Sequence, residues 1–213
     1  INKPITLDGN GYKLTSSAPR AINVSEASGV TIKDLTIVAS GERAINVINN
    51  STDVVIDGVV AQAANYAVNV AGSAAGAKVT IVNSDLTGLN TVNVAAKNVL
   101  VTVKDSTILC DDQNASENYA ALALAVEAEG SKIIATNTAI TVNGDSSKGH
   151  VGCENGTITI DGSESGVVKA VAYISYGNNA YTFTSLENAI EFAKDGEVIE
   201  LINNTSSSEI IVI

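Results

Sequence analysis

A short phrase that recurs at nearly constant spacing constrains the fold of this chain more than any other feature. The phrase is "RAINV" at Arg20–Val24 and at Arg43–Val47, "YAVNV" at Tyr66–Val70 and "NTVNV" at Asn90–Val94. A second track of alternating apolar residues reads "ITLDG", "VTIKD", "VVIDG", "VTIVN", "VTVKD", "IIATN" and "ITIDG", starting at positions 5, 30, 54, 79, 101, 133 and 158. Most steps are 22 to 25 residues long, so one structural unit repeats about seven times with a single insertion.

Each repeat carries two short runs of alternating polar and apolar residues joined by turn residues. In "AINV", the Ile and Val point to one face of an extended chain and the Asn to the other. Strands that return in the same register predict a solenoid in which each coil pairs in parallel with the next. Because parallel crossovers are strongly right-handed, we predict an all-β, right-handed parallel β-helix of about seven 22–25-residue coils, followed by one short C-terminal amphipathic helix and terminal strands.

The repeat aligns equivalent residues into ladders along the solenoid. We expect one inward ladder of Ile22, Ile45, Val68 and Val92, and a second of Ile5, Val30, Val54, Val79, Val101, Ile133 and Ile158. Amide side chains in equivalent positions can hydrogen-bond along such a stack. We therefore expect an outward ladder made by Asn23, Asn46, Asn69 and Asn93.

The charge of the chain and the length of its apolar runs argue against two classes of partner, nucleic acids and the membrane interior. Twenty-three acidic residues against 12 basic ones give a formal net charge of −11. Nucleic-acid binding needs a basic footprint, so it is not expected. No run approaches 18 apolar residues, so membrane insertion is not expected either. The acidic surface suits an extracellular or cell-surface protein, and we expect that location; the chain starts at Ile1 rather than Met, as expected of a processed product.

The insertion "LCDDQNASENYA" at Leu109–Ala120 interrupts the regular repeat. Loops that leave a regular scaffold often carry function. The carboxylates Asp111, Asp112 and Glu117 could hold Ca²⁺, although the order of ligands in a known calcium loop is missing. A solvated acidic loop is the alternative, and otherwise no metal or other cofactor is expected.

The chain resembles the pectate-lyase-like superfamily of right-handed parallel β-helices, through "ITLDGNGYKL" at Ile5–Leu14 and the "VTIKDLTI" track. The resemblance covers nearly the whole chain and implies the fold. It is not specific for function, because the family includes lyases, glycosidases, esterases, adhesins and phage spikes.

The catalytic motifs of the family's enzymes are incomplete in this chain. Family hydrolases of the polygalacturonase type carry N-T-D, D-D, G-H-G and R-I-K in that order. Here "NSD" ends at Asp85, "DD" is Asp111 and Asp112, "GHVG" contains His150, and no R-I-K follows. These four residues are the only catalytic candidates, and the incomplete motif favours a non-catalytic, adhesin-type member.

Cysteine and glycosylation signals leave alternatives open. Cys110 and Cys153 allow one disulfide, with two thiols as the alternative. Several Asn residues begin N-x-S/T sequons, and Asn114 in the insertion is the best glycosylation candidate if the protein is exported by a cell that glycosylates asparagine.

The last 41 residues differ from the repeat, so we divide the chain into a β-helix (1–172) and a helix-plus-strand segment (173–213). Thr184 and Glu187 form a capping box, an apolar stripe follows, and Gly196 is expected to end the helix. The phrase "SLENAIEFAKDGEVIEL" resembles the N-terminal cap of β-helix domains. The segment therefore either begins a second module or caps a neighbouring copy.

The function that we expect is that of a non-enzymatic extracellular structural or adhesive protein that assembles head-to-tail into filaments. The alternatives are a carbohydrate-active enzyme, such as a pectate lyase or polygalacturonase-like hydrolase, and a glycan-binding module. The partner is then another copy of the chain, or a polysaccharide. The residues expected to mediate self-association are Ile1, Ile5, Leu7, Leu186, Ile190, Ile199, Leu201, Ile210 and Val212.

Overall fold

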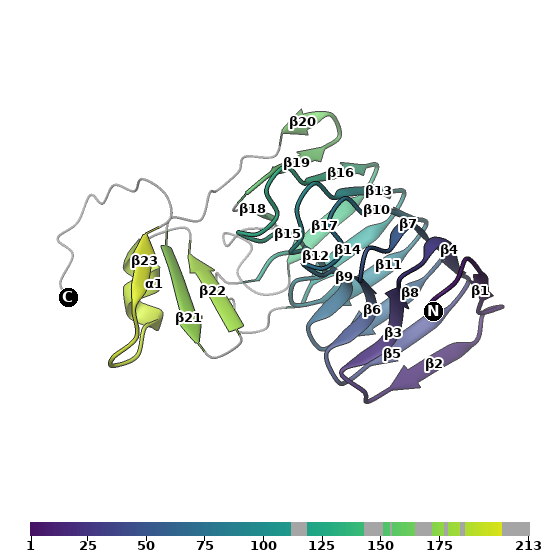
Figure 1. The fold of residues 1–213 in the computed structure, drawn as a ribbon, viewed down its shortest axis with the longest axis horizontal. Helices are drawn as coiled ribbons and strands as arrows, with labels where there is room; N and C mark the ends of the chain where they lie inside the picture. The colour runs from purple at the N-terminus through teal and green to yellow at the C-terminus, as the bar shows by residue number, and fades with distance from the viewer. Residues whose placement is uncertain are drawn as a thin grey trace.

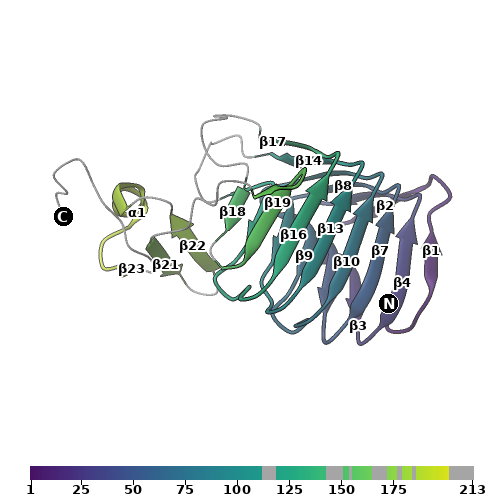
Figure 2. The same ribbon diagram turned by 90° about the horizontal axis from the view of Figure 1, so that it is seen from above.

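A computed structural model of the chain describes residues 1–111, 119–142, 151–153, 155–164, 172–176, 179–183 and 186–201. Within these residues the chain is an all-β parallel solenoid followed by a small mixed unit (Figures 1 and 2). The predicted fold class is therefore confirmed.

Three parallel sheets form the walls of the solenoid, and each coil contributes one strand to each wall. Sheet A contains β1 (Thr6–Asp8), β4 (Ser28–Lys33), β7 (Thr52–Asp57), β10 (Lys78–Val82), β13 (Leu100–Lys104), β16 (Lys132–Thr136) and β19 (Thr157–Ile160). Sheet B contains β2 (Lys13–Ser16), β5 (Thr36–Ala39), β8 (Val60–Ala63), β11 (Asp85–Gly88), β14 (Thr107–Cys110) and β17 (Ala139–Val142). Sheet C contains β3 (Arg20–Ser25), β6 (Arg43–Ile48), β9 (Tyr66–Val70), β12 (Val92–Val94), β15 (Leu122–Leu124) and β18 (Val151–Cys153).

Six complete coils result, and β19 begins a further one. The second sequence track forms sheet A, and the "AINV" phrase forms sheet C. The prediction of two strands per repeat was wrong, because sheet B adds a third. All six of its strands are four residues long, and β5, β8, β11 and β14 bury only two side chains each, which makes their alternation hard to recognise in sequence. At the far end of sheet A, the short strand β20 (Ser163–Glu164) folds back antiparallel to β19.

The two apolar ladders point into the core as predicted. The parallel register aligns Val30 with Val54, and Ile22 with Ile45. All members of both ladders are buried except Ile5, which is 37% exposed because it lies on the first coil, with a neighbour on one side only. Such ladders of β-branched residues fit a pleated, buried surface well.

The asparagine ladder of sheet C is hydrogen-bonded but is not solvent-facing. Asn46, Asn69 and Asn93 each donate from Nδ2 to Oδ1 of the asparagine one coil earlier, over 2.9, 2.8 and 2.8 Å. The predicted hydrogen-bonded ladder is confirmed; Asn46, Asn69 and Asn93 are buried, and Asn23, at the end of the stack, is exposed. Asn46 and Asn69 each have an asparagine on both neighbouring coils, whereas Asn93 has Asn69 on one side and Ala123 on the other.

The corner between sheets A and B is built from one left-handed residue per coil. From the second coil on, this residue is Asp34, Gly58, Asn83, Asp105, Asn137 and Asp161, with φ between 47° and 61°. Gly, Asn and Asp tolerate this conformation better than other residues. At two of these corners the next residue is a serine, and the hydroxyls of Ser84 and Ser106 accept a backbone N–H from the preceding coil.

The C-terminal segment forms its own sheet and its own small core. Strands β21 (Ala172–Tyr176), β22 (Asn179–Phe183) and β23 (Ile199–Leu201) pair antiparallel in the order β22-β21-β23, and α1 (Leu186–Phe192) precedes β23. The core is Ala172, Ile174 and Ala189. The helix ends at Phe192, so the prediction that Gly196 ends it was wrong; Gly196, with φ 86°, lies in a later turn closed by the bond from Glu197 N to Lys194 O. Thr184 lies outside the described residues.

Candidate functional site

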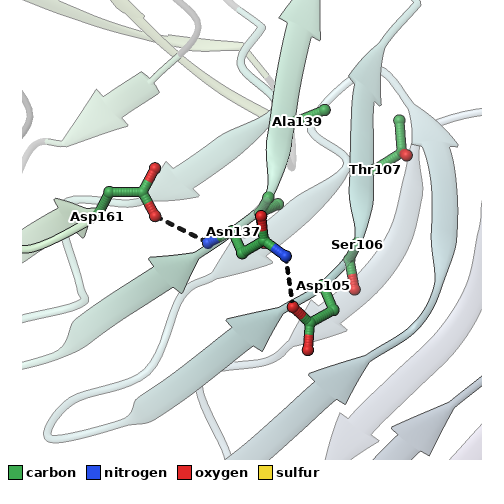
Figure 3. Close-up of a pocket in the computed structure, with 7 residues that line it drawn as sticks. Asp105, Ser106, Thr107, Asn137, Ala139 and Asp161 are labelled. Atoms are coloured by element: carbon green, nitrogen blue, oxygen red, sulfur yellow. Dashed lines mark hydrogen bonds between the residues drawn. The ribbon is translucent and has the colours of Figure 1, made fainter.

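A shallow polar groove lies on the A–B corner at the last three coils of the solenoid (Figure 3). It has a volume of about 520 Å³. The residues that line it follow the ends of β13 and β16, start β14 and β17, or follow β19; they are Asp105, Ser106, Thr107, Asn137, Thr138, Ala139 and Asp161. The left-handed corner residues of three successive coils therefore supply its two carboxylates and its amide.

Asn137 holds the two carboxylates of the groove in place. Its Nδ2 donates to Oδ1 of Asp105 over 2.6 Å, and its backbone N donates to Oδ1 of Asp161 over 2.8 Å. Oδ2 of Asp105 lies 3.5 Å from the ammonium of Lys104. The two carboxylates thus lie on either side of Asn137, and its side-chain amide binds Asp105 while its backbone N–H binds Asp161.

The hydrogen bond from Asn137 lowers the pKa of Asp105 below its ordinary value of 3.8, and the nearby Lys104 lowers it further. The carboxyl is therefore ionised at neutral pH. Because the folded state favours the charged form, the bond contributes stability that is present above about pH 4 and is lost as the pH falls further.

The polar groups of the groove are chemically suited to a ligand that offers hydroxyl groups. Its rim presents carboxylate, amide and hydroxyl groups, which accept from and donate to such a ligand. The negative charge of Asp105 and Asp161 disfavours acidic ligands. In the part of the chain that the structure describes, no group of three or more His, Cys, Asp or Glu side chains is arranged to hold a metal ion.

The structure does not bring Asp85 and Asp111 together. Asp85 is the first residue of β11, at the A–B corner, and pairs with Thr107 on the next coil. Asp111 follows the end of β14, at the opposite end of sheet B, and its N donates to Gly88 O. Four residues along a strand separate them by about 13 Å. Asp112 and His150, the other two catalytic candidates, lie outside the described residues.

The remaining predicted sites fall largely outside the described residues. Asp112, Asn114 and Glu117 of the insertion are in residues 112–118, so neither the calcium site nor the glycan is tested. Cys110 is buried at the end of β14. Cys153 ends β18, but the position of its side chain is not described. The Cys110–Cys153 disulfide stays a prediction.

The predicted self-association residues lie at the two ends of the molecule. Ile1 and Leu7 pack partly buried against the core at the first coil, beside the exposed Ile5. Leu186, Ile190 and Ile199 are partly buried in the C-terminal unit, whereas Leu201 is 58% exposed. Ile210 and Val212 lie outside the described residues.

The two ends differ in charge and share exposed apolar side chains. Residues 1–24 carry three basic residues and one acidic residue, whereas residues 186–201 carry five acidic residues and one basic residue. Six large apolar side chains are exposed among the described residues, and four of them lie at the ends: Ile5, Tyr12, Val198 and Leu201. The two ends are thus complementary in charge.

Sequence analysis missed the corner groove, although its signal is in the repeat. Each phrase of the second track from position 30 on ends at or near an Asp, Asn or Gly, and these are the left-handed corner residues. The track was interpreted only as a strand, so the column of polar side chains along the corner was not predicted.

No known protein family, curated protein or solved structure matches this chain. None of the described helices is long and apolar enough to cross a membrane. The parallel β-solenoid is therefore established by the structure, whereas membership of the pectate-lyase-like superfamily stays a prediction.

Proposed function

We propose that the protein is a non-enzymatic structural or adhesive solenoid of the cell surface or extracellular space, and that it associates head-to-tail with other copies. The observation that carries this proposal is the complementarity of the two ends in charge and in exposed apolar residues. A contact between unlike ends of identical chains repeats without closing, which produces a filament.

The strand edges of the first coil support the same proposal. Among the described residues, β1, β2 and β3 each stand last in their sheet; β1 and β2 pair with a strand on one side only, and the outer side of β3 bonds only to Ile1. An unpaired edge is a template for another strand. The separation of Asp85 from Asp111 supports the non-enzymatic part, because a hydrolase of the family's type needs its carboxylates around one bond.

The test is the association of the full-length chain and of charge-reversed variants. Reversing Lys13 and Arg20 to Glu at the first coil should weaken self-association at low salt by about tenfold, because each change replaces an attraction to the acidic unit with a repulsion. The measurement is sedimentation equilibrium over a range of protein and salt concentrations.

The matched control is K78E with K132E, which reverses two exposed lysines in the middle of sheet A and should leave association unchanged. A wild-type chain that stays monomeric at high concentration would contradict the proposal. Equal weakening by both pairs of variants would show that only the overall charge matters.

A second candidate function is glycan binding, which the polar corner groove favours. Asp105 and Asp161, held by Asn137, present further acceptor sites beside the hydroxyl of Thr138. This set suits the hydroxyls of a neutral sugar, and its charge disfavours a uronic-acid polymer.

Replacing Asn137 with Gly tests the groove, because Gly keeps the left-handed backbone and removes the amide. We expect the affinity for neutral oligosaccharides to fall about tenfold in isothermal titration calorimetry. N83G makes the same change two coils earlier, outside the groove, and should bind as the wild type does. Wild-type protein that binds acidic oligosaccharides better than neutral ones would contradict this assignment.

A further inference from the structure

The hydroxyl groups of Ser106 and Thr138 in the corner groove donate their protons within the protein. Ser106 Oγ donates to Lys104 O over 2.7 Å and accepts the backbone N–H of Ser84 over 3.1 Å. Thr138 Oγ1 donates to Thr136 O over 2.9 Å. Because a hydroxyl carries a single proton, neither group keeps a donor for a ligand. A ligand of the groove must therefore supply most of the donors itself.

Acceptor atoms, in contrast, remain available on the groove. Asp105 and Asp161 each bond to Asn137 through one oxygen, and Figure 3 shows their other oxygens turned away from it. The second oxygen of Asp161 makes no hydrogen bond or ion pair with a described residue. The donors left on the lining side chains are the hydroxyl of Thr107 and the second N–H of the Asn137 amide. The groove is thus mainly a receptor for hydrogen-bond donors.

The groove also carries negative charge that the described part of the protein does not neutralise. The ammonium of Lys104 pairs with Asp105, whereas no Lys or Arg of the described residues pairs with Asp161. Asp85 pairs in register with the groove residue Thr107, so a third carboxylate borders the groove on the preceding coil. Surface charges of one sign attract a ligand of the opposite sign. A cationic group therefore suits the groove better than a neutral one.

We propose that the groove binds a hexosamine, a sugar with a free amino group, whose ammonium donates to Asp161. The inference rests on the glycan-binding function proposed for the groove and names the class of sugar. An ammonium brings three donors and a positive charge, and the ring hydroxyls supply donors for Asp105 and for the carbonyl of Asn137. A neutral sugar meets the same acceptors but leaves Asp161 without a counter-charge. The groove volume of about 520 Å³ lies within the range of about 300–1,000 Å³ that is typical of small-molecule sites.

Titration calorimetry with three 1,4-linked tetrasaccharides tests the proposal on the full-length chain. The ligands are the tetramers of glucosamine, N-acetylglucosamine and glucose. We expect the glucosamine tetramer to bind about fivefold more tightly than the other two, which corresponds to one solvent-exposed charge pair, and we expect this preference to weaken as salt is added. Equal binding of the three ligands would overturn the inference and leave the glycan-binding function standing. If none of the three binds, the glycan-binding function fails, and the inference fails with it.

The variant Asp161→Asn removes the charge but keeps the acceptor for the backbone N–H of Asn137, and asparagine tolerates the left-handed corner, where φ is 47°. We expect this variant to bind the glucosamine and glucose tetramers with equal affinity. Asp34→Asn is the matched control, because Asp34 occupies the same corner position on the second coil, with φ 48°, outside the groove. The control should keep the preference of the wild type. Loss of the preference in both variants would mean that only the net charge matters, which would overturn the inference.

A linear polyamine separates the amino group from the sugar that carries it. The polyamine offers ammonium groups without ring hydroxyls, so we expect it to bind the wild-type chain more weakly than the glucosamine tetramer does. A polyamine that binds as tightly as the glucosamine tetramer would show that the sugar ring contributes nothing, and the assignment of a hexosamine would then be wrong.

Discussion

Replacing Asn69 with Ala should lower the free energy of unfolding by about 3 kcal/mol. Asn69 is 3% exposed and makes two ladder bonds, one donated to Asn46 and one accepted from Asn93. Each lost bond costs about 1 kcal/mol, and a buried amide left without its partner costs about 1–3 kcal/mol more. Asn46 keeps a second donor, the guanidinium of Arg43 at 3.3 Å, so most of the cost falls on Asn93.

Asn23→Ala is the matched control for this prediction. Asn23 is the first member of the same ladder. It is exposed and accepts only one ladder bond, from Asn46. Water can replace that bond, so the expected loss is about 1 kcal/mol. Urea unfolding followed by circular dichroism measures both variants. Equal losses would mean that burial does not determine the contribution of the ladder.

The regular part of the fold could be predicted because a solenoid repeats one local pattern. In "VTIKD" the alternation of Val30 and Ile32 against Thr31 sets the inward face of sheet A, and the same pattern in every coil fixes the register. Each coil has only its neighbours as partners, so few long-range possibilities had to be excluded. The same logic could not reveal sheet B. In "VAQA" (Val60–Ala63) the two buried residues are alanines, which give almost no hydrophobic alternation.

The candidate site could be predicted less well, because it depends on corners and not on strands. A conformation with positive φ at Asn137 has no periodic apolar signal, yet it turns the amide toward Asp105 on the previous coil. The catalytic candidates, in contrast, were chosen by order along the chain. That order does not show whether two residues lie at the same end of a sheet. Asp85 and Asp111 lie at opposite ends of sheet B.

Replacing Ile81 with Ala should also lower the free energy of unfolding by about 3 kcal/mol, whereas the same change at Ile134 should cost less than about 1 kcal/mol. Ile81 lies in β10, is fully buried, and stands in the ladder between Ile56 and Val103, so its truncation leaves a cavity that strands paired on both sides cannot close. Ile134 lies in β16 on the outer face of the same sheet and is 37% exposed, so solvent fills the space. Both strands belong to inner coils, and the comparison therefore isolates the direction of the side chain. Urea unfolding of the two variants measures the difference, and similar losses at both positions would contradict the inward and outward assignment of sheet A.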